Sequence, residues 1–457
     1  MLGWLAAQPV TAQTLTESLA AAYSTNPSLN VDRAQLRAVD ENIAIARSGN
    51  RPVIQGTFDY LNATTRTNFS GVVRNPATGD LSRGNDATDG VARSTFRVRL
   101  TQPLFEGFQT RNAIRGAEAA VRAGRSNLES TEQQVLLAAA VSFLDILQNG
   151  QIVGLRQNDV EFLGEQVRAA QDRFEVGEGT RTDVSQAEAR RAQAQTSLNF
   201  AVANLAAAQA DYRQVTGLTA RNLRDNYNVE RLLPRSLEAA FDIAQNNHPD
   251  IISALHDVDV NLFNVAELSG RALPTVNAFV EGSTTLEPST QVDRTDNAQI
   301  GLNVTVPIYQ GGLVSAQVRQ AKENLGAARI QVDVARDVIR QRVATSWSAF
   351  QASVRSIFNA QTGVFSAQLA LQGVVEEQRV GQRTTLDVLD AQRELIVAQI
   401  TLAQAARNRD ANAFQLLADI GQLNARRLGL SVNEYQPAEH TDAVRGKWYG
   451  FRTPDGR

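Results

Sequence analysis

Apolar residues recur at every seventh position through residues 311–379, in the second half of the chain. No proline interrupts residues 311–379, and the spacing slips once by four residues before the repeat of seven resumes. Repeats of seven with such a slip are typical of a long coiled-coil helix with a stutter. At 1.5 Å per residue, the segment predicts one helix of roughly 100 Å. The large residues of the series are Val318, Leu325, Val332, Ile339, Val343, Phe350, Ile357, Val364 and Leu371.

The first half of the chain contains the same series, because the sequence is an internal duplication. The segment 176–184 (VGEGTRTDV) matches 380–388 (VGQRTTLDV), and Pro27 matches Pro249 at the start of a predicted helix in each copy. The extra residues of the first copy fall in a polar loop within 68–90, which is typical of a surface loop. We divide the chain into repeat 1 at 13–220, a linker at 221–235, repeat 2 at 236–424 and a tail at 425–457.

Two alternating segments precede each long helix. In the segment 94–102 (STFRVRLTQ), Phe96, Val98 and Leu100 face one way, and the residues between them face the other way. Alternation with period two predicts strands that have one apolar and one polar face. Each repeat therefore contributes a β-hairpin, and the chain has four predicted strands. The other three strands are predicted at 53–60, 275–282 and 299–306.

Prolines and glycines mark the borders between the predicted elements. Proline cannot donate a backbone hydrogen bond, and glycine adopts positive φ, so both interrupt regular structure. Each long helix also ends at a Val-Gly pair, which predicts a tight turn before a return helix. The strand–helix junctions are Pro52, Pro103, Gly107, Pro274, Pro307, Gly311 and Gly312, and the turns contain Val176, Gly177, Val380 and Gly381.

The composition argues against several functions. The formal net charge is −3 and no basic stripe is visible, so nucleic-acid binding is not expected. There is no cysteine and the three histidines are scattered, so we expect no metal site and no thiol chemistry. Phosphate-binding and hydrolase motifs do not occur. We therefore expect a protein that is not an enzyme and that uses no cofactor.

The N-terminal residues resemble a processing signal. Residues 1–12 are mostly apolar and end in Val-Thr-Ala before Gln13, which is similar to a signal-peptidase site. No Lys or Arg occurs before Arg33, so the usual basic region of a secretory signal is absent and we expect residues 1–12 to be the remnant of such a signal. No run of about 18 apolar residues follows, and we expect no transmembrane helix. Membrane strands leave little hydropathy signal and stay possible.

Four strands cannot close a membrane barrel on their own. Single-chain barrels begin at about eight strands, and an open sheet edge in lipid costs several kcal/mol for each unpaired group. If the strands enter a membrane, chains must combine, and three chains would supply 12 strands. The alternative is a soluble periplasmic coiled-coil scaffold or adaptor protein. That alternative accounts for the helices but not for the paired alternating segments.

Three features together resemble the TolC family of outer-membrane channel-tunnels. They are the duplicated layout, the junctions PLFEGF (103–108) and PIYQGG (307–312), and the segment VGQRTTLDVLDAQ (380–392). The resemblance covers about residues 14–424. It implies an α+β membrane protein that forms a homotrimer in the outer-membrane lipid of a Gram-negative bacterium. The four strands of each chain would form a shared 12-stranded β-barrel, continued by a long periplasmic α-helical coiled-coil barrel.

The resemblance also implies an export function. An inner-membrane transporter of the ABC or RND class and a periplasmic adaptor (membrane fusion) protein would dock on the helical end and open it. We expect the Val-Gly turns to form the adaptor-docking rim. The cargo would be secreted proteins, small toxic compounds or both. The segment 173–190 (RFEVGEGTRTDVSQAEAR) is most similar to members that serve type I secretion.

Family roles can be assigned near the second turn. Asp387 and Asp390 match acids that form a ring at the periplasmic entrance of the channel. Arg383 matches an arginine that holds the closed tip through residues matching Thr182 and Asp183 of the adjoining hairpin. The tyrosine that forms a second latch in the family is replaced by Gln378, so this closing contact is not expected in the same form.

The two acids also have a simpler interpretation. An aspartate in the first turn of a helix is favoured as a cap and by the helix dipole, and Asp387 has a counterpart in Asp183. Asp390 aligns with Gln186, so capping does not account for it, and the channel role is favoured there. If three chains crowd these carboxylates together, some of them should have a raised pKa.

The tail lies outside the duplication and contains three aromatic residues close together. Trp448, Tyr449 and Phe451 are followed by only a few residues of sequence. They are expected either to pack against the middle of the helical barrel or to trail from it as a free end.

Overall fold

The computed structural model describes residues 13–456, apart from 69, 84–86, 225–226 and 290. The expected signal remnant at 1–12 lies outside the described residues. The chain divides into two compact units, each assembled from three segments. Unit 1 comprises the chain up to Val39, Ala120–Asp257 and Ala328–Asp442; unit 2 comprises Asp40–Ala119, Val258–Ala327 and the residues from Ala443 onward. Each unit draws on both sequence repeats.

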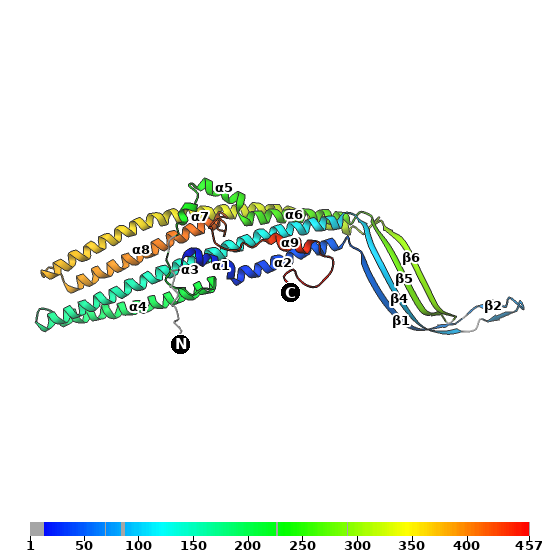
Figure 1. Cartoon of the computed structure of the whole chain (residues 1–457), viewed down its shortest axis with the longest axis horizontal. Helices are drawn as coiled ribbons and strands as arrows, with labels where there is room; N and C mark the ends of the chain where they lie inside the picture. Colours follow the sequence, from blue (N-terminus) through cyan, green and yellow to red (C-terminus); the bar gives the residue numbers. More distant parts are fainter. Residues whose placement is uncertain (1–12, 69, 84–86, 225–226, 290, 457) are drawn as a thin grey trace, which may run out of the picture. The chain divides into compact units, whose positions relative to one another are not determined.

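Unit 2 contains a four-stranded antiparallel sheet with the strand order β1-β4-β5-β6 (Figure 1). All four predicted strands are confirmed, and each is longer than its alternating segment because backbone pairing continues toward the hairpin ends. A small hairpin, β2 (Val72–Arg74) and β3 (Leu81–Arg83), lies in the expected loop. The main strands are β1 (Val53–Thr67), β4 (Ala87–Glu106), β5 (Thr275–Ser289) and β6 (Val292–Thr305).

The pairing register gives this sheet one apolar and one polar face. Side chains of paired residues share a face, and neighbouring rows alternate. The predicted alternation is therefore confirmed across all four strands. The outer strands β1 and β6 each have one edge without a strand partner in the described part of the chain. One apolar row consists of Ile54, Leu100, Val280 and Ile300, and the polar row beside it consists of Gln55, Arg99, Glu281 and Gln299.

The junction residues have distinct backbone roles. Pro52 and Pro274 directly precede β1 and β5, and Pro307 follows β6. Pro103 lies inside β4, not at its end as expected, and the register shifts beside it. A proline fits there because a bulge removes the need for its missing N–H. Gly107 has φ +61°, and a Cβ on it would lie 2.3 Å from the carbonyl oxygen of Gly270.

Gly311 and Gly312 also have positive φ, of +61° and +81°, at the turn that leads into the next long helix. Only glycine adopts two such angles in succession without strain. The helix that follows, α7, is the one predicted from the heptad pattern. It runs from Leu313 to Arg379 and contains 67 residues, as does its counterpart α3 (Gln109–Glu175). The predicted long helices are therefore confirmed.

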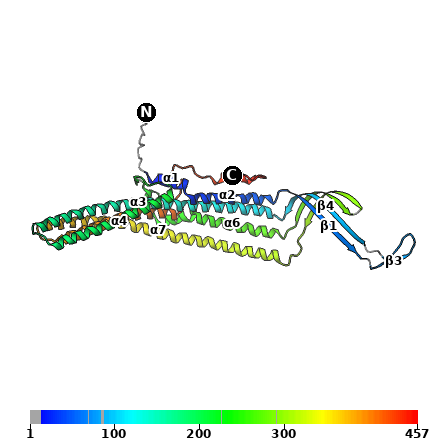
Figure 2. The ribbon, with the colours of Figure 1, turned by 90° about the horizontal axis from the view of Figure 1, so that it is seen from below.

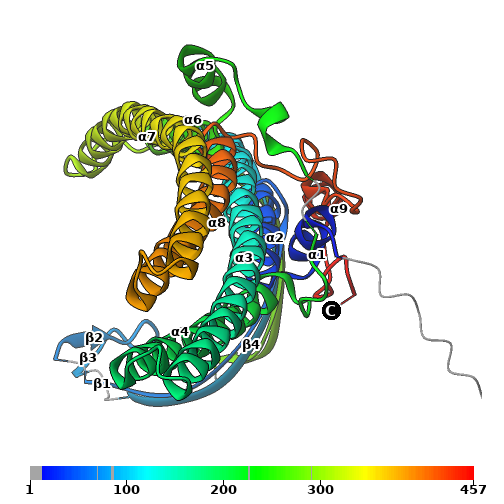
Figure 3. The same cartoon turned by 90° about the vertical axis from the view of Figure 1, so that its left-hand side faces the viewer.

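The remaining helices complete the two repeats. Helices α2 and α6 begin at the proline of the Asn-Pro and His-Pro pairs, as predicted. Helix α8 packs between α7 and the α3–α4 hairpin in unit 1 (Figure 3). These helices are α1 (Leu15–Thr25), α2 (Pro27–Ser48), α4 (Arg181–Thr216), α5 (Leu237–Asn247), α6 (Pro249–Gly270), α8 (Thr385–Asp419) and α9 (Pro437–Arg445), with a 3₁₀ turn at Val229–Leu232.

The heptad seam of α7 is half-buried at Val318, buried from Leu325 to Phe350 and half-buried again toward the turn. Leu325, Val332, Ile339, Val343 and Phe350 are buried against the rest of the chain. The positions that continue the series toward the turn remain partly exposed. Within a single chain, part of the coiled-coil seam is therefore not fully buried. The half-buried positions toward the turn are Ile357, Val364 and Leu371.

The core of unit 1 gathers around the middle of α3 and the end of α8. Phe143, Tyr212 and Phe414 are fully buried, and the Tyr212 hydroxyl lies 2.7 Å from the Ser18 hydroxyl. Helix α3 contains an 18-residue window with mean hydropathy 1.4, which is apolar enough to cross a membrane. The helix passes this test by length and composition only, so the expected absence of a transmembrane helix stays a prediction. Core residues of α3 such as Leu136 explain its apolar character without a membrane.

The tail is packed through its helix. Thr441 accepts a hydrogen bond from Arg125 at 2.8 Å within unit 1, and Val444 is fully buried in unit 2. Arg47 at the end of α2 donates to the Arg445 carbonyl at 3.2 Å, and the C-terminal segment lies beside α2 (Figure 2). The helical part of the tail therefore does not trail freely.

Candidate functional site

Two helix-ending turns carry the predicted docking residues. Gly177 follows the end of α3 with φ +81°, and Gly381 follows the end of α7 with φ +76°. A Cβ at either glycine would meet no other atom within 4 Å. Val176 and Val380 are each 71% exposed. The turns therefore present apolar side chains on tight, glycine-dependent corners, where a partner can reach them.

The helix that follows each turn begins with the same reciprocal cap. Thr384 Oγ1 accepts from the Asp387 N–H at 3.2 Å, and Asp387 Oδ2 accepts from the Thr384 N–H at 2.8 Å. Thr180 and Asp183 form the same pair before α4. Each threonine–aspartate pair is a capping box in which aspartate takes the place of the usual glutamate or glutamine. The capping interpretation of Asp387 is confirmed, and its role at the channel entrance stays a prediction.

Capping fixes the direction of the pKa shift in a single chain. Hydrogen bonds from the backbone and hydroxyl of Thr384 lower the pKa of Asp387 below its usual value. Those from the hydroxyl and backbone of Thr180 do the same for Asp183. A hydrogen bond to the ionised form favours that form. The direction is opposite to the one expected from crowding, so Asp387 enters any ring of acids already stabilised as a carboxylate.

Asp390 has a partner that the sequence analysis missed. Arg190 Nη2 lies 2.8 Å from Asp390 Oδ1, joining α4 to α8. Both side chains remain partly exposed, by 29% for Arg190 and 52% for Asp390. The duplication carried a signal: Gln186 matches Asp390, and Arg190 follows it by four residues on the same helical face. The carboxylate is therefore partly neutralised within its own chain.

Arg383 pairs locally in the described chain. Its Nε lies 2.8 Å from Glu377 Oε2 across the turn, and Asp183 is occupied by Thr180. Gln378 Nε2 donates weakly to the Thr385 hydroxyl at 3.4 Å. The expected contact of Arg383 with Thr182 and Asp183 of an adjoining hairpin stays a prediction. Sequence reasoning did not identify Glu377 as the partner of Arg383 within its own chain.

A buried polar contact joins the two hairpins near these acids. Gln392 Nε2 donates to Asp159 Oδ1 at 3.1 Å, between α8 and α3. Burial raises the pKa of the Asp159 carboxyl, and the hydrogen bond from Gln392 and then the charge of Arg156 at 3.9 Å partly offset this shift. Further along, Arg407 lies 2.7 Å from Asp145. Polar contacts of this kind set the register between hairpins, because a buried partner left unpaired is costly.

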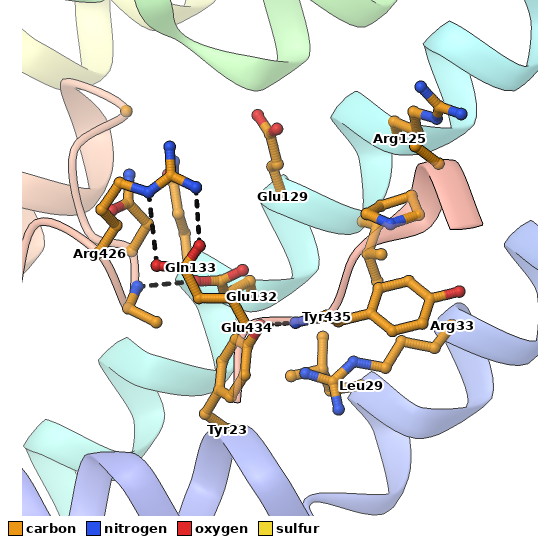
Figure 4. A pocket seen from close by; sticks show the side chains of 16 residues that line it. Tyr23, Leu29, Arg33, Arg125, Glu129, Glu132, Gln133, Arg426, Glu434 and Tyr435 are labelled. Carbon is orange, nitrogen blue, oxygen red and sulfur yellow. Dashed lines mark hydrogen bonds and ion pairs between the residues drawn. The ribbon is translucent and has the colours of Figure 1, made fainter. Parts of the chain in front are cut away.

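Unit 1 also contains a pocket of about 390 Å³ with charged walls (Figure 4). Glu132 Oε1 accepts from the Ala425 N–H at 2.8 Å, and the Arg426 guanidinium lies 2.7 Å from Glu434. The guanidinium of Arg33 lies 4.6 Å from the centre of the Tyr23 ring. These contacts tie the start of the tail to α2 and α3. No group of three or more His, Asp or Glu side chains in the described residues is placed to hold a metal ion.

Burial has the largest effect on the pKa of Glu129 and Glu132, two acids that line this pocket. Desolvation raises the pKa of Glu132, and the hydrogen bond from Ala425 and the charge of Arg33 oppose the shift. Desolvation also raises the pKa of Glu129, opposed by Arg426. The sequence analysis did not predict this pocket, because its walls come from residues 23–33, 125–133 and 421–438.

The chain is similar to proteins of one family along most of its length. The family model described as "Outer membrane efflux protein" matches residues 19–200 and 240–422. The outer membrane efflux protein BepC of Brucella suis biovar 1 is 42% identical over 99% of this chain and 95% of its own length. The outer membrane protein TolC of Escherichia coli is 28% identical over 92% of this chain and 85% of its own. The solved structure of the outer-membrane channel OprN superposes with a TM-score of 0.73 at 18% identity, covering 89% of this chain and 90% of OprN.

Proposed function

The chain belongs to the outer membrane efflux protein family, and from this premise we propose that it is the outer-membrane exit channel of a three-part export machine. The observation that carries the proposal is the two-faced sheet of unit 2. Its apolar face includes Phe58, which is 68% exposed, and Ile300, which is 83% exposed. In water, this face would be a large unfavourable surface, whereas in a bilayer it matches the lipid tails.

The polar face suits an aqueous lumen. Glu281 is held by Arg97 and Arg99, each at 3.4 Å, and by Gln299 at 3.1 Å. The polar face carries charges of both signs, which pair with one another and are compatible with contact with water. A sheet with such faces separates lipid from water, as the wall of a pore must do.

The open edges of the sheet require further copies of the chain. In lipid, each unpaired N–H or C=O of β1 and β6 costs several kcal/mol, and only closure removes all edges. We propose a homotrimer in which the edges of three sheets join as a 12-stranded barrel. The half-buried seam of α7 beyond Phe350 supports the same arrangement, because neighbouring chains would complete its cover. A soluble scaffold or adaptor gives neither feature a role.

The partners and the cargo follow from the same proposal. A periplasmic adaptor docks at the Val-Gly turns, and an inner-membrane transporter of the ABC or RND class delivers the cargo. Secreted proteins and small toxic compounds are both within the proposed range. The carboxylates of Asp387 and Asp390 line the entrance, where three chains form acidic rings that favour cations.

The proposal is tested by purifying the full chain from outer membranes. We expect a band of trimer mass on gels of unheated samples, which collapses to the monomer after boiling. The same trimer should form cation-selective channels in planar bilayers. Recovery of the chain as a soluble monomer from the periplasm would contradict the proposal, as would trimers that never conduct.

A further inference from the structure

Three exposed aromatic residues near the end of the chain have no role in the proposed channel. Trp448, Tyr449 and Phe451 are 70%, 89% and 97% exposed. All three belong to unit 2, which also contains the sheet. Neighbouring aromatic side chains that point into solvent form an apolar patch, and such patches commonly mark contact surfaces.

The chain holds this segment firmly beside the start of β1. Arg51 Nη1 donates to the Lys447 carbonyl at 2.7 Å, and the Arg51 guanidinium lies 4.8 Å from the centre of the Trp448 ring. Arg445 forms an ion pair with Glu118 at 2.6 Å. The aromatic residues are therefore presented from an anchored segment, and little further ordering is needed for them to bind.

The anchoring point coincides with the border of the apolar face of the sheet. Ile54, the first apolar-face residue of β1, follows Arg51 by three residues. Three residues of extended chain span at most about 10 Å. Trp448 is thus held close to the level at which the apolar face begins. Tryptophan and tyrosine concentrate at such borders of membrane proteins, because their rings are apolar and their N–H and O–H groups need polar partners.

Basic residues flank these rings in the sequence. Residues 443–457 include three arginines and one lysine but only one acid, an aspartate. The Lys447 amine donates to the Arg452 carbonyl, which closes a short loop. The Tyr449 and Phe451 rings lie 6.4 Å apart on this loop. Aromatic rings flanked by cations are complementary to a layer of lipid phosphates above acyl chains.

We propose that residues 445–452 form a lipid-binding loop for anionic glycerophospholipid headgroups at the periplasmic surface of the outer membrane. Trp448, Tyr449 and Phe451 enter the interfacial layer, while Arg51, Lys447 and Arg452 contact phosphates. The loop sets the depth of the sheet in the bilayer. This inference rests on the proposed insertion of the sheet.

The test uses a full-length variant with Trp448 as the single tryptophan. The sequence has two others, Trp4 and Trp347, and the variant replaces both with phenylalanine. The trimer is reconstituted into nanodiscs of phosphatidylethanolamine and phosphatidylglycerol that contain a nitroxide either at the headgroup or at the acyl-chain end. We expect the headgroup nitroxide to quench Trp448 more strongly than the chain-end nitroxide. Replacing both Lys447 and Arg452 with uncharged residues should weaken the preference of the loop for phosphatidylglycerol over phosphatidylethanolamine. The expected loss is up to about fivefold for each charge removed.

The matched control retains Trp347 alone, which packs against the core of unit 1 and should be quenched by neither nitroxide. Insertion is checked in the same samples by the trimer band of unheated gels, so failure of the channel proposal is recognised separately. In inserted trimers, quenching of Trp448 by aqueous iodide but not by either nitroxide would overturn the inference. Shielding from both iodide and nitroxide would also overturn it, because a protein surface would then cover the loop.

Discussion

Asp390 of α8 and Arg190 of α4 form an ion pair of 2.8 Å that joins the two helical hairpins of the chain. The acid that family resemblance places at the channel entrance is therefore balanced by a cation of its own chain. Asp387, one turn earlier, is balanced differently, by backbone and hydroxyl donors of Thr384. The two neighbouring acids should respond differently to substitution.

Removing Arg190 should strengthen block of the channel by multivalent cations. Arg190→Ala leaves Asp390 as an unpaired carboxylate, whereas Asp390→Asn removes the charge and should weaken the block. Exposed pairs are worth about 0–1 kcal/mol, so both variants should still form trimers. Block is measured in planar bilayers with the cation added on the periplasmic side. The double variant should behave as Asp390→Asn alone. If the block by cations is unchanged in all three variants, Asp390 has no role in the gate.

Arg383→Ser should raise single-channel conductance if Arg383 closes the tip by contacting another hairpin. In its own chain, Arg383 pairs with Glu377 at 2.8 Å, so Glu377→Gln is the matched control. That control breaks the local pair but leaves the arginine available to a neighbour. Conductance raised by Arg383→Ser alone supports the latch. Equal changes in both variants would mean that only the local pair matters.

Gly381→Trp should abolish export while trimers still assemble. The residue has φ +76°, a left-handed conformation that costs most L-residues roughly 1–2 kcal/mol. The bulky ring would also occupy the proposed adaptor site. Gly381→Asn is the control, because asparagine tolerates this conformation and is small. Export is measured by complementing a strain that lacks the channel. If both variants export normally, the turn does not dock the adaptor.

Ile300→Arg should reduce the yield of inserted trimer, because Ile300 lies on the apolar face of β6, in the same row as Ile54. An arginine facing lipid costs about 2–4 kcal/mol in each chain at the bilayer midplane and about 0–1 kcal/mol near an interface. Asn303→Arg places the same charge on the polar face of the same strand and should be tolerated. The measurement is the amount of heat-modifiable trimer in outer membranes. Equal yields of the two variants would show that the apolar face does not contact lipid.

Glu132→Gln should stabilise the folded chain at neutral pH. Burial raises the folded-state pKa of Glu132 above 4.5, so the unfolded chain loses this proton first as the pH rises. The free energy of unfolding therefore falls from about pH 4.5 up to the raised pKa. Glutamine can still accept the hydrogen bond from Ala425 and carries no charge to desolvate. Melting temperatures in detergent should be higher for the variant at pH 8 and equal to the parent near pH 4. A lower melting temperature at pH 8 would show that attraction to Arg33 outweighs desolvation.

The sequence alone determined the four main strands, the long helices and their order. Heptad spacing and alternation are local properties, and 67-residue helices or paired strands repeat them often enough to be unambiguous. The duplication added a second copy of each signal. The Val-Gly turns and the threonine–aspartate caps could likewise be predicted, because each depends on residues within a few positions of one another.

Only the tertiary structure decided which distant residues meet. Asp390 and Arg190 are 200 positions apart, and Arg51 and Lys447 are 396 apart. No local periodicity records such pairs, because an exposed arginine or acid fits many positions on a helix surface equally well. The placement of the tail shows the same limit. Its aromatic residues were visible in the sequence, but their position beside the start of β1 depends on hydrogen bonds from the side chains of Arg47 and Arg51 to backbone carbonyls of the tail, which are 398 and 396 positions away along the chain.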